Sequence, residues 1–238
     1  MLRSLLYFLK LIIYWLFFFT LYRICFLIIY ANKIPDGTLS DALMIFYHSI
    51  RLDFATIGHL IFIPFVIWAL QQFTKANLLN HINYIYNVIL IISITLLCIS
   101  TIALYDEWNA LINYNTLHYL ISPAKIFPYL STIGLIIVSI GAVVVITIFI
   151  LLFRLLILMV IPYSTEKMIY KIIILPIAFP LLVIMMRGGV TANSINERSA
   201  CFSKTKFFDH ISVNPVWHLS HMTALAIEAY SQPDQEKK

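Results

Sequence analysis

Two short groups of charged residues interrupt an otherwise apolar chain and are the first candidates for chemistry. Arg51 and Asp53 lie just before one apolar run, and Asp106 and Glu107 lie just after another. Charges near hydrocarbon are costly and often functional, and paired carboxylates can hold a metal or act as acid and base. The alternative is that all four are structural and lie at the level of the lipid headgroups.

Two histidines near the C-terminus have the spacing of a single helix face. They are His218 and His221, with His210 upstream. A metal site needs three or four ligands at compatible spacing, and the sequence has no HExxH motif and no CxxC pair. Histidines at a membrane interface are the ordinary alternative. We expect no metal or cofactor to be held by this chain.

Known catalytic motifs are absent from the sequence. It has no Walker motif, no GxSxG, no dinucleotide fingerprint and no kinase set. Nothing in it builds an activated nucleophile with a base and an oxyanion site. The chain alone is therefore not expected to be an enzyme.

Five long apolar runs must position these residues. Each is long enough, or nearly so, to cross a hydrocarbon core of roughly 30 Å as a helix. Hydrophobic residues make up 61% of the 238 and charged residues 11%, so too little polar sequence remains to cover five such helices in water. The fold class is an all-α polytopic membrane protein with five transmembrane helices. The runs are Leu5–Tyr30, Phe54–Leu70, Tyr84–Leu104, Ile133–Val160 and Met168–Met186.

Local signals refine these helices. The turn-rich stretch Asn32–Asp41 ends the first helix. The second helix is expected to begin before its apolar run and to include Phe46–Asp53. Pro176 and Pro180 should kink the fifth helix.

The character of the sequence changes after Met186. Residues 1–186 are expected to form the transmembrane domain, and residues 187–238 an extracytoplasmic linker with a short amphipathic helix. Arg187 is followed by two glycines that tolerate positive φ, a helix stop. Asn214-Pro215 predicts an N-cap with proline at the first helical position. The helix then carries Trp217 along the outer membrane surface. We expect Arg187 and Trp217, like the four charged residues above, on the lipid headgroup side.

Positive charge orients the chain. Lys and Arg are more frequent in the segments that are inside when the N-terminus is cytoplasmic, which places the C-terminus outside after five spans. The formal charge of +5 is scattered over helix ends and forms no stripe, so nucleic acid is not an expected partner. The inside residues are Arg3, Lys10, Lys75, Arg154, Lys167 and Lys171, against Lys33, Arg51 and Lys125 outside.

Three stretches carry a resemblance to a known family. Together they resemble the N-terminal membrane half of the lipoteichoic acid synthase-like phosphoglycerol transferases, which belong to the sulfatase superfamily. The likeness covers almost the whole chain. The stretches are Phe46–Phe54; Tyr105–Trp108 with Leu120–Lys125; and Arg187–Gly189 with Ser194–Asn196, Phe202-Ser203 and Asn214–Trp217.

The resemblance implies a function that this chain does not complete. Members of the family continue into an extracytoplasmic catalytic domain with a divalent metal such as Mn²⁺ and a threonine nucleophile, which transfers phosphoglycerol from a lipid. No catalytic residue has a counterpart here, so we expect a membrane anchor truncated before that domain, in a bacterial cytoplasmic membrane.

Two alternatives remain open. The chain is a non-catalytic subunit that partners a separately encoded sulfatase-type domain, or it is a small lipid transporter or flippase. Membrane lipids are partners in every case, and a homo-oligomer is compatible with each. The sequence leaves the lipid headgroup, the acceptor and the role of His218 and His221 undetermined.

Overall fold

The computed structural model describes residues 2–35, 38–74, 77–113, 116, 132–157, 168–190 and 194–231. Throughout these residues the regular structure is helical and no strand occurs. Four helices are long and apolar enough to cross a membrane. The part of α6 whose side chains are described, Leu175–Arg187, is a shorter apolar helix. The chain is an all-α polytopic membrane protein, as predicted. The helices are α1 (Leu2–Ile29), α2 (Leu39–Gln71), α3 (Asn77–Trp108), α5 (Thr132–Leu156), α6 (Met168–Arg187), α7 (Lys206–Ser212) and α8 (Pro215–Ser231), with 3₁₀ turns at Ala31–Lys33 and Glu197–Ser199.

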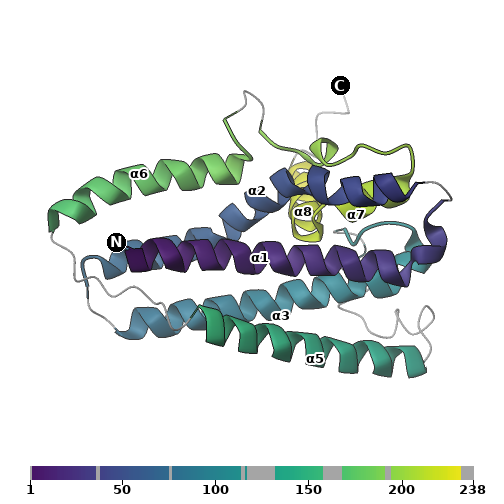
Figure 1. Cartoon of the computed structure of the whole chain (residues 1–238), viewed down its shortest axis with the longest axis horizontal. Helices are drawn as coiled ribbons and strands as arrows, with labels where there is room; N and C mark the ends of the chain where they lie inside the picture. Colours follow the sequence, from purple (N-terminus) through teal and green to yellow (C-terminus); the bar gives the residue numbers. More distant parts are fainter. Residues whose placement is uncertain are drawn as a thin grey trace.

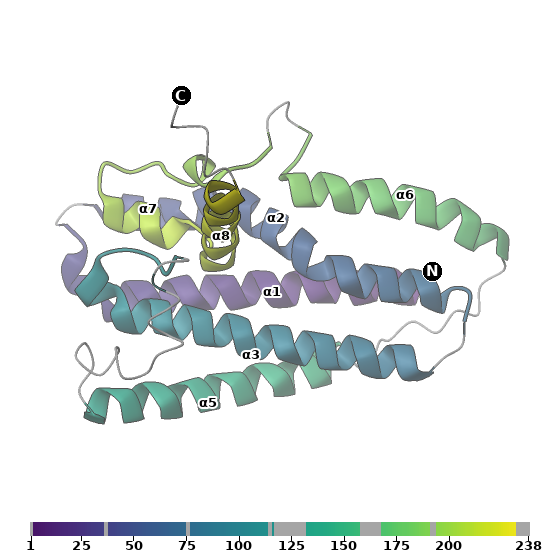
Figure 2. The same cartoon turned by 180° about the vertical axis from the view of Figure 1, so that it is seen from behind.

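The long helices lie roughly along one axis (Figure 1). Helix α1 packs against α2, α5 packs against α3, and α6 packs against α2. The tail after α6 returns over α2 and places α7 beside its first half. Helix α8 is seen nearly end-on from both sides, so it crosses the bundle axis at a steep angle (Figure 2).

A stripe of large side chains on α1 forms much of the core. Its members recur every three or four residues, which is the spacing of one helix face. Aromatic residues of α7 join the same core, where Phe207 and Phe208 are buried and Phe207 lies against Phe26 of α1. The tail is therefore packed into the bundle. The buried stripe contains Tyr7, Leu11, Tyr14, Trp15, Phe18, Phe19, Tyr22, Phe26 and Tyr30.

The second helix is longer than its apolar run, and it includes Phe46–Asp53 as predicted. The predicted loop is too long at its C-terminal side, because α2 already begins at Leu39 and contains Ser40 and Asp41. Pro64 lies inside α2, where its ring and missing N–H favour a bend, and the ribbon of α2 changes direction along its length in Figure 1.

Some sequence predictions lie outside the described residues. They concern residues 117–131, which include Leu120–Lys125, the end of the fourth apolar run from 158 to 160, and residues 232–238. Asp106 and Glu107, which lie just after the third apolar run, belong to the last turn of α3.

Candidate functional site

A buried ion pair joins the first two helices. Arg23 of α1 is 1% exposed and Asp53 of α2 is 3% exposed. The guanidinium Nη1 lies 2.7 Å from Oδ2, and Nη2 lies 2.8 Å from Oδ1 of the carboxylate. This is the bidentate geometry in which an arginine and a carboxylate bind most strongly. Asp53 was a predicted site residue, and the structure shows that its side chain is buried between the helices.

Three backbone carbonyls complete the surroundings of Arg23. Its Nε donates to the carbonyl of Ile211 at 3.1 Å and its Nη2 to that of Ser212 at 3.1 Å, while Nη1 donates to Phe19 at 3.3 Å. A guanidinium has five N–H groups. The three carbonyls and the two oxygens of Asp53 together accept all five. The side chain therefore has no donor left for a ligand, and it fastens the tail to the bundle.

The end of α7 explains why these carbonyls are available. The last carbonyls of a helix lack partners within the helix. After Ser212 the backbone becomes extended at Val213, so the helix stops and its final carbonyls face α1. A cation at this position also interacts favourably with the negative end of the helix dipole.

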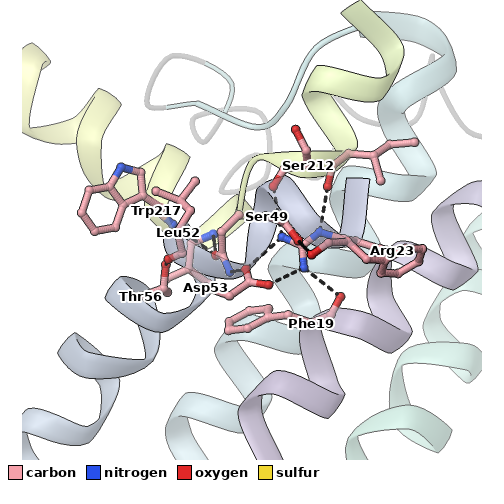
Figure 3. A network of polar contacts seen from close by, with 12 residues as sticks. Phe19, Arg23, Ser49, Leu52, Asp53, Thr56, Ser212 and Trp217 are labelled. Atoms are coloured by element: carbon pink, nitrogen blue, oxygen red, sulfur yellow. Dashed lines mark hydrogen bonds and ion pairs between the residues drawn. The ribbon is translucent and has the colours of Figure 1, made fainter. Parts of the chain in front are cut away.

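Asn214 links the ion pair to α8. Its Nδ2 donates to Oδ1 of Asp53 at 2.8 Å, while its own Oδ1 accepts from the N–H of Val216 at 3.0 Å and of Trp217 at 3.4 Å. The second pair of contacts is an N-cap, and Pro215 occupies the first helical position, as predicted. We call Arg23, Asp53 and Asn214 the latch (Figure 3).

The tail before the latch is held in shape by its own polar side chains. Asp209 accepts the backbone N–H groups of Phe202 at 2.9 Å and Ser203 at 3.0 Å. The Ser212 hydroxyl donates to the carbonyl of Ala200 at 2.6 Å. These bonds close the loop from 200 to 212 on itself, so α7 meets Arg23 in a fixed orientation.

The predicted helix stop after Arg187 is confirmed. Gly188 and Gly189 have φ of +80° and +122°. Their N–H groups bond to the carbonyls of Met185 and Ile184, the two bonds of a Schellman motif. A Cβ on Gly188 would lie 2.6 Å from Ile195, so only glycine fits. Nε and Nη2 of Arg51 donate to the Gly188 carbonyl at 3.3 and 3.2 Å.

The acidic pair at the end of α3 lies apart from the latch. Asp106 forms an ion pair with Lys33 at 2.7 Å, and 66% of the Asp106 side chain is exposed. Lys33 also lies 5.1 Å from the ring centres of Tyr30 and Tyr105. Glu107 is exposed. Exposed ion pairs contribute little energy, and the arrangement is that of a structural contact at a helix end.

The three histidines do not meet at one point, because only His218 and His221 face a common partner. His218 and His221 share a helix face and direct Nδ1 toward Oε1 of Glu197 at 3.0 and 3.5 Å. His210 instead contacts the Tyr105 hydroxyl through Nδ1 at 2.9 Å, and burial lowers its pKa. Among the described residues no group of three or more His, Cys, Asp or Glu could hold a metal, so the donor set does not fit one.

Trp217 lies against the bundle. Its ring is half-buried next to a small core cluster that includes Leu52 and Val213, and it meets His59 edge-on at 5.7 Å. Of the predicted site residues, the structure therefore brings Asp53 and Trp217 together around Asn214. It places Arg51 beside the Arg187 helix end as a second group.

Sequence reasoning missed Arg23. It lies within the first apolar run, although a lone arginine inside such a run is expensive and needs a buried partner. This cost was the feature of the sequence that could have identified Arg23 as a residue with a buried partner. The second role of Asn214, as a donor to Asp53, had no signal in the sequence because the two residues are 161 positions apart.

Comparisons with protein-family models, with curated proteins and with solved structures found no match.

Proposed function

We propose that the chain is the membrane-anchoring module of a lipoteichoic acid synthase-like phosphoglycerol transferase. One observation supports this. The latch unites two of the stretches on which the resemblance rests, since Asp53 belongs to Phe46–Phe54 and Asn214 to Asn214–Trp217. The remaining stretch also contacts the tail, because Tyr105 bonds to His210. Asp53, Tyr105 and Asn214, one residue from each stretch, thus take part in contacts between the bundle and the tail.

The geometry suits an anchor that fixes the direction of its C-terminal tail. Arg23 holds α7 through two carbonyls, and Asn214 sets the start of α8 directly after it. Helix α8 therefore leaves the bundle in one direction, across the helix axis. In this proposal the tail faces the outside of a bacterial cytoplasmic membrane and holds a catalytic domain at a set distance from its lipid substrates.

The chemical step belongs to that catalytic domain. The described residues of this chain supply neither a metal site nor a side chain free to act as a nucleophile at the latch. In this proposal a sulfatase-type domain, with its divalent metal, performs the transfer. It is linked in the same polypeptide or binds as a separate subunit.

The test is metal-dependent release of diacylglycerol from phosphatidylglycerol in native membranes. Deleting the coding region should abolish the release, and the wild-type sequence should restore it. Asp53→Asn should restore it poorly, because the tail loses its anchor point. The matched control is Asp106→Asn, which removes an exposed carboxylate and should restore release fully.

Two results would contradict the proposal. Membranes that keep full activity after the deletion would show that the chain anchors no such enzyme. Release of diacylglycerol by the purified chain alone would show that it is itself the enzyme. Copurification from native membranes then decides whether the catalytic domain is covalently linked or separate.

A further inference from the structure

A groove opens between α2 and α6, on the surface of the bundle. Its volume is roughly 300 Å³. All but one of the described lining residues are apolar or glycine, and the exception is the Arg51 guanidinium. The lining consists of Arg51, Phe54, Leu181, Ile184, Met185, Gly188 and Gly189.

The sequence builds this groove from two helix stripes. Arg51, Phe54 and Gly58 succeed one another at spacings of three and four on α2, so they share a face. At Gly58 the two helices touch, and a Cβ there would lie only 2.9 Å from the backbone nitrogen of Met186. The groove lies beside this close contact, where side chains separate the helices again.

The apolar wall faces outward. Leu181 is 61% exposed and Ile184 is 38% exposed. In a membrane protein such side chains meet acyl chains. The cation stands where α6 ends, and charged residues at helix ends lie at the headgroup level. A phospholipid has the same order of parts, an apolar chain followed by an anionic phosphate.

We propose that this groove binds one anionic phospholipid. An acyl chain lies along Phe54, Leu181 and Ile184, and the phosphate meets the guanidinium of Arg51. A guanidinium suits a phosphate because its planar fork of N–H groups matches the spacing of two phosphate oxygens. The Gly188 carbonyl orients Arg51 through two N–H groups.

The groove is separate from the latch. Residues two apart on a helix do not face the same way, so Arg51 faces α6 while Asp53 faces the interior. The proposal also does not depend on the proposed function, because it requires only that the chain lies in a bilayer. If one of the two proposals is disproved, the other is unaffected.

Photolabelling of the full chain tests the proposal. The chain is placed in phosphatidylcholine vesicles that contain a small share of phosphatidylglycerol with a diazirine on its acyl chain. Peptide mapping should find labels on α6 around Leu181 and Ile184 and on α2 around Phe54. A phosphatidylcholine probe with the same diazirine should label these sites much less.

Two variants distinguish the contribution of the Arg51 charge from that of the open volume of the groove. Arg51→Gln removes the charge and should lower labelling by the anionic probe on the order of tenfold, the effect of one charge-assisted bond. Ile184→Trp fills the groove, leaves Arg51 in place and should also prevent labelling. Arg154→Gln is the matched control, because Arg154 is an exposed arginine in the last turn of α5.

Hydrogen exchange of α7 and α8 should be unchanged in Ile184→Trp, which shows that the tail stays docked. Equal labelling of wild type and Ile184→Trp would overturn the proposal. So would equal labelling by the two lipid probes, or labels spread evenly over the exposed apolar helix faces.

Discussion

Two of the buried polar clusters in the described part of the bundle satisfy their hydrogen-bonding groups in different ways. The latch pairs opposite charges and joins α1 and α2 to the tail. At the other end of the bundle Tyr7 of α1 accepts a hydrogen bond from Nδ2 of Asn83 at 2.7 Å, and Asn87 donates to Asn83. The second cluster, which we call the asparagine cluster, is neutral and joins only α1 and α3.

The two clusters also differ in how completely they are paired. All five N–H groups of Arg23 have acceptors. In the asparagine cluster Oδ1 of Asn87 is buried and has no partner in the described part of the chain. An unpaired charge in the interior costs far more than an unpaired amide. A neutral cluster can therefore tolerate an incomplete set of bonds, whereas an ionic one cannot.

Breaking the ion pair should have the largest effect. Asp53→Ala leaves the Arg23 charge buried without its counterion, which costs about 3–5 kcal/mol. Unfolding in detergent, followed by circular dichroism, measures this loss. Hydrogen exchange should show the greatest change in α7 and the start of α8. A change below about 0.5 kcal/mol would mean that the interior is open to water.

A double variant separates the charge from the docking. Arg23→Met with Asp53→Leu removes both charges and should restore much of the lost stability, since apolar pairs can replace buried ion pairs. Exchange in α7 should nevertheless stay fast, because the Ile211 and Ser212 carbonyls still lack their donor.

The next largest effect is expected at Asn214. Asn214→Ala removes both the N-cap of α8 and the bond to Asp53, so the loss should exceed the cost of about 1 kcal/mol for a cap alone. Asn214→Ser keeps a capping oxygen but cannot donate to Asp53 as the amide does. The difference between the two variants in exchange of α8 measures the cap. Equal exchange in both would mean that the cap contributes nothing.

The asparagine cluster should be less sensitive. Asn83→Leu removes two neutral side-chain hydrogen bonds, one to Tyr7 and one from Asn87, while Asn87 keeps its bond to the backbone carbonyl of residue 83. The loss should be about 1–2 kcal/mol, with no change in exchange of the tail. Pairing it with Tyr7→Phe removes the hydroxyl left without its donor and should bring stability back toward wild type. A loss as large as that of Asp53→Ala would remove the distinction between the two clusters.

The smallest effect is a pH dependence of the tail. Burial lowers the pKa of His210 below the ordinary 6.5 when the tail is docked. Its neutral form is therefore favoured in the docked state, and the stabilisation is present above pH 6.5 and lost as the pH falls from there through the lowered pKa. His210→Asn should flatten the pH profile of exchange in α7.

The comparison must be made between wild type and His210→Asn at each pH. His210 is also close to Asp209, Lys206 and His218, and His218 and His221 face Glu197. If the wild type and the variant have the same profile, His210 does not govern the dependence.

Local features of this fold were predictable from the sequence. Apolar length predicts the long helices, two adjacent glycines predict the stop at Arg187, and Asn214-Pro215 predicts the start of α8, since each depends on neighbouring residues alone. The predicted loop before α2 overlaps the helix start, because Ser40 and Asp41 suit both a turn and a first helical turn.

The latch was not predictable in this way. Asp53 was a candidate, but its partner is set by how α1 faces α2, and the carbonyls that complete the site come from 188 and 189 positions later. The residue types and their spacing along the sequence do not indicate such a contact. The cost of burying Arg23 was the one physical argument that required a partner.

The latch also has a consequence for biosynthesis. Arg23 and Asp53 leave the ribosome before Ile211, Ser212 and Asn214 and can enter the membrane as a paired helical hairpin before the tail is made. Until then two N–H groups of Arg23 lack their acceptors, the carbonyls of Ile211 and Ser212. The latch can therefore close only in a chain translated past residue 214. A chain that stops earlier keeps an arginine with two unpaired N–H groups, which membrane quality control can recognise.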